Sequence, residues 1–334
     1  MTLTGINNND LKLILFGGKG GVGKTSCAIA TAFELSKKFK TLIISTDPAH
    51  SVSDCLEQPI GFNIKEIAGV RNLSAIEVDA DEALTEFKKE HQNELTKLLE
   101  TSTYLDKDDI DEMLTLSIPG IDEVMSFNTI LKLVEEGNYE KYIVDTAPTG
   151  HALRLISSPK LLDGWIKVAA KIRWKYRFMI TRFSGTYQKD EVDAMLLSLK
   201  KTVKRIENIL QDNSKCEFIP VCIPEAMAIM ETERLLAELK RYKINIKQII
   251  VNNLLQSEDC NFCKKRKTAQ KKYIRQISET FTSLMMIPVP LQPEEIKGIE
   301  NLRRLGMLLF GGELLKPEQF RSAASDEKIK RLRK

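Results

Sequence analysis

Residues 16–26 are the part of the chain whose residue types and spacing most clearly indicate chemistry. Gly18 is followed, after four residues, by Gly23, Lys24 and Thr25, which matches the phosphate-loop pattern in full. Glycines let backbone N–H groups curve around phosphate oxygens that a side chain would obstruct. Lys24 is the expected partner of the β- and γ-phosphates of a nucleoside triphosphate, and the Thr25 hydroxyl is placed to bind Mg²⁺.

Lys19 is surplus to this pattern, because an ordinary phosphate loop needs a single lysine. The residues expected to hold the nucleotide are Gly18, Lys19, Gly20, Gly21, Val22, Gly23, Lys24, Thr25 and Ser26. Since Lys19 stands at the start of the loop, its ammonium group can point across a subunit boundary toward another molecule's nucleotide. The loop therefore favours a nucleotide-dependent dimer over a solitary ATPase.

The elements around the loop are those that the motif requires. Residues 11–16 form an apolar run suited to a buried parallel strand, and residues 26–38 carry helix formers with helical spacing. Alternation of strand-like and helical patterns along the chain predicts an α/β fold, a P-loop NTPase with a mostly parallel doubly wound sheet. The expected strands are 11–16, 41–45, 73–78, 141–144, 218–223, 247–251 and 284–288.

Two stretches interrupt this alternation, because they lack a convincing strand and are rich in Leu, Met, Lys and Glu. We expect both to form one inserted helical subdomain. The expected division is a nucleotide-binding domain of residues 10–80, 137–151 and 214–312, a helical subdomain of residues 81–136 and 152–213, and a polar basic tail of residues 313–334. No internal repeat is present, so a second nucleotide site must come from a second copy of the chain.

The composition is that of a soluble globular protein, with 334 residues, 43% hydrophobic and 29% charged. A net charge of +4 is too weak to argue for nucleic acid as a partner. No apolar run approaches the roughly 18 to 20 residues of a membrane span, and the N-terminus lacks a signal-peptide layout. Six scattered cysteines suit a reducing compartment, so a cytoplasmic location is expected.

Acidic residues follow two of the predicted strands, where a doubly wound fold brings side chains to the nucleotide. Asp145 closes KYIVD and has the Walker-B placement, holding Mg²⁺ through water. Asp47 and Asp54 are candidates to orient or deprotonate the attacking water, with a structural turn and a helix cap as the alternatives. Residues 149–150 are candidates to sense the γ-phosphate, and His151 is favoured as a hydrogen-bonding loop residue over a base.

Cys260 and Cys263 form a C-x-x-C pair, followed at once by KKRK. Two thiolates are half of a tetrahedral zinc site, and this chain has no second C-x-x-C. A two-fold dimer would supply the missing half by placing the same pair opposite itself. A redox pair, another metal and an inert exposed pair stay open as alternatives.

Two further polar residues at strand ends are candidates to contact the nucleotide. Asn252 could bond an adenine edge, since an amide offers both a donor and an acceptor, or it could be a simple turn residue. Glu225 could contact ribose or adenine, or serve as an acidic residue in the first turn of a helix.

Methionines in the helical stretches have two interpretations. The default is that they form the core of the helical subdomain, and the alternative is an open groove for an apolar helix. The methionines in question are Met113, Met125, Met179 and Met195. Aromatic and basic residues also alternate over 165–178, which could mark a subunit contact or a surface for acidic headgroups.

Taken together, KGGVGKTS, STDPAHSVSD, DTAPTGHALRL, PEAMAIMETERL, IVNN and CNFC, in this order, resemble the ATPases that target tail-anchored membrane proteins. That family groups with the arsenite-pump ATPases and the MinD-like deviant P-loop proteins, and the resemblance covers about residues 10–310. It implies a cytosolic homodimer that closes over two ATP molecules and opens after hydrolysis. Dimers could also pair into tetramers.

The resemblance also implies residue roles. Lys19 would reach the partner subunit's nucleotide, and Asp54 would act on the attacking water. The remaining roles are phosphate and Mg²⁺ binding by Lys24 and Thr25, second-shell magnesium binding by Asp145, nucleotide contacts by Glu225 and Asn252, and half of an intersubunit Zn²⁺ site at Cys260 and Cys263.

The implied client is the C-terminal transmembrane helix of a tail-anchored protein, held in a composite apolar groove of the helical subdomains and handed to a membrane receptor. One rival is an arsenite-stimulated ATPase subunit of an efflux pump, which resembles two fused copies of this unit. Another is a redox-controlled holdase chaperone that exposes apolar helices when C-x-x-C is oxidised.

Overall fold

The computed structural model describes residues 2–47, 49, 51–100, 120–147, 149–184 and 190–311. Two compact units divide the chain. The first comprises residues 1–77, 137–152 and 211–334, and the second comprises residues 78–136 and 153–210.

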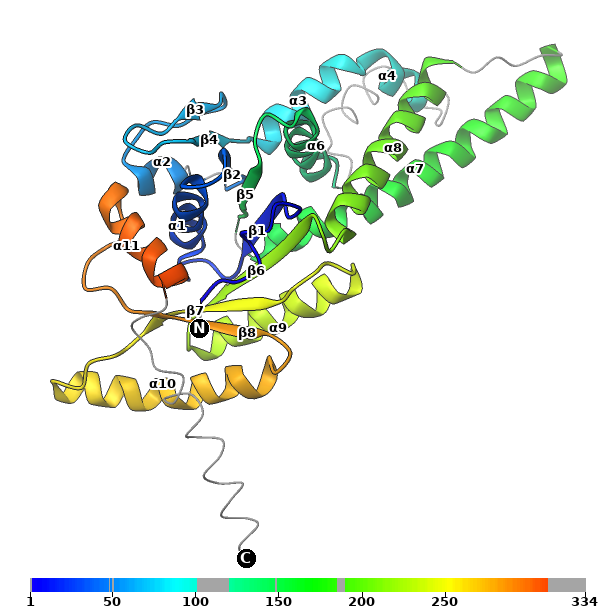
Figure 1. The fold of residues 1–334 in the computed structure, drawn as a ribbon. Coiled ribbons are helices and arrows are strands. Elements are labelled where there is room, and N and C mark those ends of the chain that lie inside the picture. The colour runs from blue at the N-terminus through cyan, green and yellow to red at the C-terminus, as the bar shows by residue number, and fades with distance from the viewer. Residues whose placement is uncertain are drawn as a thin grey trace, which may run out of the picture. The chain divides into compact units, whose positions relative to one another are not determined.

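The first unit is built on a sheet of eight strands, of which seven are parallel to their neighbours (Figure 1). The strands are β1 Leu13–Gly17, β2 Thr41–Ser45, β3 Lys65–Glu66, β4 Leu73–Glu77, β5 Lys141–Asp145, β6 Cys216–Cys222, β7 Gln248–Leu254 and β8 Met285–Pro290. Their order across the sheet is β3-β4-β2-β5-β1-β6-β7-β8, and among the described strands only β3 runs antiparallel, against β4. The mostly parallel sheet predicted from the alternating pattern is thus confirmed, and the two-residue β3 is an addition.

Strand β1 marks the switch point of the sheet. After β1 the chain moves outward on one side to β2 and β4, and after β5 it moves to the other side through β6, β7 and β8. Because crossovers between parallel strands are right-handed, this reversal places helices on both faces and leaves a crevice beyond the carboxyl end of β1. The glycine loop of residues 18–23 begins at that end.

Helices cover both faces of this sheet. They are α1 Lys24–Ser36, α2 Ser51–Leu56, α9 Ala226–Arg241, α10 Asn261–Thr280 and α11 Gly298–Gly311. Helices α1 and α11 lie side by side, so closely that a Cβ on Gly306 would lie 2.9 Å from the Ala30 carbonyl oxygen (Figure 1). The apolar faces of both helices join the strands in one core, since Ile29, Leu302 and Ile43 are fully buried. This packing fixes the start of α1 relative to the strand ends.

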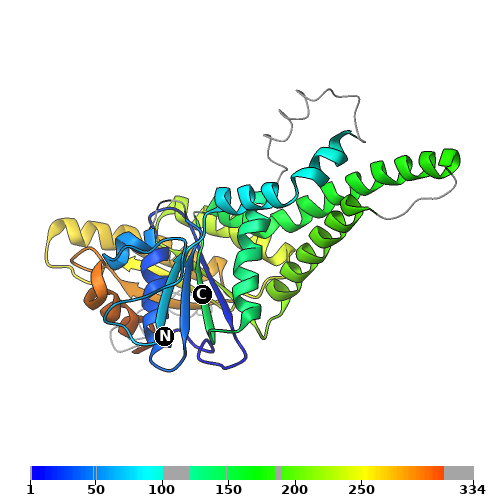
Figure 2. The same ribbon diagram turned by 90° about the horizontal axis from the view of Figure 1, so that it is seen from above.

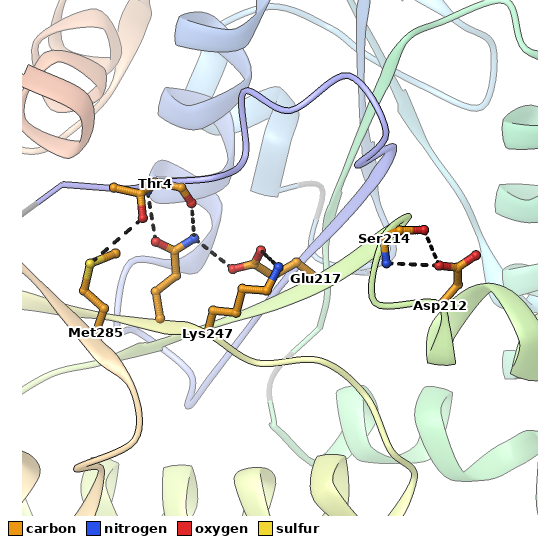
Figure 3. Close-up of polar contacts among 7 residues, drawn as sticks. Thr4, Asp212, Ser214, Glu217, Lys247 and Met285 are labelled. Atoms are coloured by element: carbon orange, nitrogen blue, oxygen red, sulfur yellow. Dashed lines mark hydrogen bonds and ion pairs between the residues drawn. The ribbon is translucent and has the colours of Figure 1, made fainter.

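The N-terminal segment is tied to the sheet by a polar cluster in which Gln248 bonds both Thr4 and Glu217. Figure 3 labels Thr4, Glu217 and Lys247 of this cluster. The amide of Gln248 accepts a hydrogen bond from the Thr4 N–H and donates one to the Thr4 carbonyl, both at 3.2 Å. The same amide nitrogen donates to Glu217 at 2.8 Å. Glu217 is fully buried, and Lys247 lies 3.9 Å from its second carboxylate oxygen. Burial raises the pKa of Glu217, opposed by Gln248 and Lys247.

The second unit is helical in its described part. It contains α3 Ala80–Glu90, α4 Gln92–Glu100, α6 Ile121–Glu136, most of α7 Thr149–Ser184, and α8 Glu191–Gln211. Helices α7 and α8 lie side by side in both views (Figures 1 and 2). The two chain segments that form this unit connect on either side of β5. The first joins β4 to β5, and the second joins β5 to β6.

The helical unit has its own core, in which two of the methionines are buried. Along α8 the buried positions Val192, Met195, Leu199 and Val203 repeat at helical spacing. Met125 on α6 is buried too, so the default interpretation holds for both methionines. Met113 and the side chain of Met179 lie outside the described residues. None of the helices in the described part of the chain combines the length and apolar character needed to cross a bilayer.

Candidate nucleotide-binding site

The glycine loop leaves backbone donors free at the start of α1. Gly23 precedes the helix with a φ of +91°, and no side-chain cap bonds its first turn among the described residues. A Cβ on Gly23 would lie 2.4 Å from the Asn252 amide nitrogen, and a Cβ on Gly18 would lie 2.2 Å from the Val221 carbonyl oxygen. Only glycine fits such positions. Uncapped N–H groups and the helix dipole together make an anion site suited to phosphate.

The two lysines of the loop have different surroundings. Lys24 opens α1 and is buried, with 5% of its surface exposed, and it makes no ion pair with any described residue. The charge of Lys24 interacts with the buried carboxylate of Asp145, but no described carboxylate is in ion-pair contact with the ammonium group. An anionic ligand would offset the cost of burying this charge, which fits the phosphate role. Lys19 is half-buried, and its side chain makes no hydrogen bond or ion pair within the described residues. It is therefore available to a ligand or a second chain.

Thr25 and Asp145 meet beneath the loop. The Thr25 hydroxyl donates to Asp145 Oδ2 at 2.7 Å, and the Ser51 hydroxyl donates to the same oxygen at 3.4 Å. Asp145 is fully buried, and its Oδ1 has no hydrogen-bond partner among the described residues. Burial raises the pKa of Asp145 to about 6, while the Thr25 hydrogen bond and the Lys24 charge lower it. A threonine hydroxyl beside a carboxylate with an open oxygen fits Mg²⁺, which prefers oxygen ligands.

A cavity of about 580 Å³ opens over the loop and the start of α1. It is lined by Gly21, Gly23, Thr25, Ser26, Ala49, Ser51, Asp54, Cys55, Asn252, Asn253 and residues 291–297 apart from Pro293. Its size is that of ordinary small-molecule sites. The structure thus brings together four sequence-predicted groups: the glycine loop, Thr25, Asp54 and Asn252.

The two candidate acidic residues after β2 differ in their contacts. Asp47 Oδ1 accepts a hydrogen bond from the Ala49 N–H at 3.1 Å, which is the local turn weighed as its alternative role. Asp54 is exposed on α2 and lines the cavity, and its carboxylate caps no helix within the described residues. The Asp54 carboxylate is therefore exposed at the cavity, where its charge also acts on Lys297.

Asn252 links β7 to the glycine loop. Its amide nitrogen donates to the Val22 carbonyl at 2.9 Å, and its buried Oδ1 has no partner among the described residues. The β7–β8 pairing is irregular between Val251 and Leu254, and Asn253 adopts a φ of +59°. Such irregularities re-aim side chains near functional sites. The open acceptor fits a contact to a nucleotide base.

Other sequence-predicted residues lie elsewhere. Glu225 is the exposed residue before α9 and does not line this cavity. Residues 149–150 open α7, and their side chains, with that of His151, lie outside the described residues.

The segment 291–297 is a part of the site that the sequence motifs did not indicate. It follows β8 at the same sheet edge as the glycine loop, and it contacts α2 where the Cys55 thiol donates to the Ile296 carbonyl at 3.4 Å. The sequence offered one signal for this part of the site, which is that the segment follows a predicted strand. The carboxyl ends of parallel strands lie at one edge of the sheet, so the segment could be expected near the glycine loop.

The exposed cysteine pair lies at the start of α10. Cys260 precedes the helix, and its sulfur accepts a hydrogen bond from the Cys263 N–H at 3.1 Å and lies 2.7 Å from the Cys263 sulfur. Hydrogen bonds from Cys263 lower the pKa of Cys260. The other four cysteines are buried. Within the described residues no group of three potential ligands forms a metal site, and the Cys260–Cys263 pair by itself offers two sulfur atoms as possible ligands.

A glycine loop after the switch-point strand, a lysine and threonine at the start of the next helix, and an aspartate at the end of the neighbouring strand define a P-loop nucleoside triphosphatase. A family model described as anion-transporting ATPase matches residues 11–311, and the chain belongs to that family. It is therefore an ATPase that takes ATP, as the sequence resemblance predicted.

Individual relatives match over nearly their full length. The chain is 37% identical over 316 residues to a Paramecium tetraurelia protein named ATPase ASNA1 homolog 1, covering 91% of this chain and 94% of the relative. It is 34% identical over 319 residues to ATPase get3 of Pyrenophora tritici-repentis, covering 91% and 92%. It is 37% identical over 318 residues to ATPase GET3 of Lachancea thermotolerans, covering 91% of each chain.

Proposed function

We propose that this chain is a cytoplasmic homodimeric ATPase that holds the C-terminal transmembrane helix of tail-anchored proteins and couples ATP binding and hydrolysis to their delivery to a membrane receptor. The observation that carries the client role is a set of exposed apolar side chains on the helical unit of an ATPase of this family. They are Leu161, Val168, Trp174 and Phe178 on α7, each at least 53% exposed, and Leu197 on α8.

These side chains support an apolar client rather than a structural role. Trp174 and Phe178 stack with ring centroids 6.1 Å apart while both stay more than half exposed. Large exposed apolar groups gathered on one element mark an interaction site. The groove of our proposal is thus built from these exposed residues and not from the buried Met125 and Met195.

The residues of the nucleotide site divide the chemistry of hydrolysis among them. Lys24 and the loop N–H groups would hold the phosphates, and Asp54 would orient or deprotonate the attacking water. Thr25 would hold Mg²⁺, with Asp145 behind it through water. When bound, the metal neutralises charge on the β- and γ-phosphates. The carboxylate of Asp145 is buried and accepts hydrogen bonds from the Thr25 and Ser51 hydroxyls. These two contacts hold it in one orientation.

Lys19 is proposed to act on the nucleotide of the partner subunit. A complementation experiment tests this directly, using Lys19→Met and Asp54→Asn chains that are each inactive alone. If Lys19 acts across the dimer, a mixed dimer contains one site with an intact Asp54 and a Lys19 supplied by the partner. An equal mixture then recovers about a quarter of wild-type ATPase activity, because about half the dimers are mixed and one site in each works. If Lys19 acts within its own subunit, no mixture recovers activity.

The cysteine pair is proposed to supply half of a Zn²⁺ site shared between two subunits. Cys260 and Cys263 place their sulfurs together on the exposed start of α10, where a two-fold axis can bring a second pair opposite them. Thiolates of this kind suit zinc.

The client role is tested by co-expression with a tail-anchored protein, with and without its transmembrane segment. Recovery that requires the segment, and that falls in the Trp174→Glu/Phe178→Glu variant, supports the proposal. The matched control is Met227→Glu on α9 of the other unit, a similarly exposed position, which should retain capture. Recovery regardless of the segment contradicts the groove, and arsenite stimulation of the purified ATPase favours the pump subunit instead. Client protection under oxidant without ATP favours the redox-controlled holdase.

A further inference from the structure

Helix α2, which carries Asp54, rests on two acidic side chains at the carboxyl edge of the sheet. Ser45 ends β2 and pairs in register with Asp145 of β5 on one side and Glu77 of β4 on the other. Adjacent strands lie about 4.8 Å apart, so the two acids stand in one row across β2 with about 10 Å between their backbones. The Ser51 hydroxyl of α2 donates to Asp145 at 3.4 Å. Asp145 belongs to the proposed Mg²⁺ site, whereas Glu77 lies outside the lining of the nucleotide cavity.

Glu77 binds the first turn of α2 through one carboxylate oxygen. Glu77 Oε1 accepts hydrogen bonds from the Ser53 N–H at 3.1 Å and from the Ser53 hydroxyl at 2.9 Å. The N–H groups of a first turn have no partner within their own helix, so this carboxylate satisfies one of them from another element. The Glu77 side chain is 4% exposed. Its two bonds hold Ser53 by both backbone and side chain, which fixes the position of the first turn and its rotation about the helix axis.

The chain beyond α2 is held by the same two residues. The Ile60 N–H donates to the Ser53 hydroxyl oxygen at 3.1 Å, and the Glu77 N–H donates to the Gly61 carbonyl at 3.0 Å. Glu77 therefore fixes the chain both before and after Asp54. Among the described residues no hydrogen bond or ion pair holds the Asp54 carboxylate itself, so its position at the cavity depends on the backbone of α2.

We propose that Glu77 is a positioning residue for ATP hydrolysis, which holds the Asp54 carboxylate at the nucleotide cavity through its two bonds to Ser53. This inference rests on the proposed role of Asp54 in hydrolysis. Ser53 directly precedes Asp54, so the bonds of Ser53 determine where the next Cα stands and in which direction its side chain leaves the helix. A misplacement of about 1 Å at a catalytic group can cost about 10²-fold in rate.

The first test compares two substitutions of Glu77 in the full-length protein. Glu77→Met keeps the approximate side-chain volume and removes the acceptor, so kcat for ATP hydrolysis should fall about 10–100-fold. The KM for ATP should stay within about twofold, because the glycine loop and Lys24 are unchanged and the loss is confined to the transition state. Glu77→Gln keeps an oxygen that can accept both hydrogen bonds from Ser53, and its kcat should stay within about threefold of the wild-type value.

Amide hydrogen exchange follows the position of α2 without reference to activity. In Glu77→Met, peptides that cover α2 should exchange at least about tenfold faster than in the wild type, because the Ser53 N–H has lost its acceptor. The same peptides should stay protected in Glu77→Gln. Peptides from α9, which lies at another place on the sheet, should exchange equally in all three proteins.

A double variant shows whether Glu77 acts through Asp54. In an Asp54→Asn background, Glu77→Met should lower kcat by less than about twofold further, because residues that act as a unit are not additive. Gln248→Leu is the control for lost stability, since Gln248 bonds Thr4 and Glu217 and makes no bond to α2. With rates divided by the folded fraction, its kcat should equal that of the wild type.

The outcomes separate this inference from the proposed role of Asp54. Wild-type kcat in Asp54→Asn would remove that role. If Asp54→Asn loses turnover while Glu77→Met keeps it, the positioning role alone is overturned. It is equally overturned if the losses of Glu77→Met and Asp54→Asn multiply in the double variant, if Glu77→Gln loses as much as Glu77→Met, or if Gln248→Leu shows the same loss of kcat.

Discussion

Replacing Gln248 with leucine tests the polar cluster that ties the N-terminal segment to the sheet (Figure 3). The substitution keeps the side chain's approximate volume and removes its three hydrogen bonds. Two of these join the neutral backbone of Thr4, and the third supports the buried carboxylate of Glu217. After the change, Lys247 is the charge partner that Glu217 keeps, at 3.9 Å.

The size of the effect follows from these contacts. Two neutral hydrogen bonds contribute about 1 kcal/mol each, and a hydrogen bond to a charged group contributes about 1.5–3 kcal/mol. We therefore expect Gln248→Leu to lower the free energy of unfolding by about 3.5–5 kcal/mol near pH 7.5, measured by urea titration at fixed protein concentration.

The pH dependence of the free energy of unfolding distinguishes the contribution of the hydrogen bond to charged Glu217 from that of the two hydrogen bonds to the neutral backbone of Thr4. Burial raises the pKa of Glu217 above its ordinary 4.5, so the folded protein binds this proton more tightly than the unfolded chain does. Stability contributed by this group is therefore lost as the pH rises from 4.5 through the folded pKa. Gln248 lowers that pKa, and its removal raises it further. The cost of Gln248→Leu should thus shrink to about 3 kcal/mol in acid, where Glu217 is protonated and all three hydrogen bonds of Gln248 are neutral.

Gln270→Leu is the matched control. Gln270 is also buried, and its amide bonds two neutral backbone groups, the Leu255 N–H at 2.9 Å and the Asn253 carbonyl at 3.0 Å. Its loss should cost about 2 kcal/mol at every pH. An equal and pH-independent cost for both variants would refute the reasoning that Gln248 supports a buried charge.

Three further predictions concern the nucleotide and metal sites. Asp54→Asn should bind ATP normally and lose turnover by about 10²–10⁴-fold, as expected for removal of a general base, and undiminished hydrolysis would exclude Asp54 from the chemistry. Gly23→Ala should abolish ATP binding through its steric clash, whereas Gly21→Ala, at a similar positive φ with open space around it, should retain most of it; calorimetric titration compares them, and equal losses would contradict the close-packing argument. The Cys260→Ser/Cys263→Ser variant should contain no zinc, as measured by elemental analysis, and should form a weaker dimer, as measured by light scattering. An intact dimer without zinc would show that dimer formation does not depend on this metal site.

Much of the fold and the phosphate site could be predicted from the sequence, because these features rest on local patterns. The glycine loop, the apolar runs of β1 and β5 and the position of Asp145 each involve contiguous residues. The contact between Thr25 and Asp145 followed, since Asp145 ends β5 and Thr25 opens the helix that follows the neighbouring parallel strand β1.

Other parts of the site could not be predicted, because they depend on which faces the tertiary structure covers. The segment 291–297 carries no motif and reaches the cavity through the sheet topology. On α7, charged and apolar residues are spread around the helix, so periodicity could not show that Trp174 is exposed. For Met125 and Met195 the sequence favoured the core and left an open groove as the alternative, and packing against neighbouring helices buries both side chains.

The connections on either side of β5 place Asp145 on the strand that joins the two segments of the helical unit. One segment of the helical unit runs into the start of this strand, and the other leaves a few residues after Asp145 as α7. The strand whose end carries the contact between the Thr25 hydroxyl and Asp145 is therefore also the covalent link to both segments that build the helical unit.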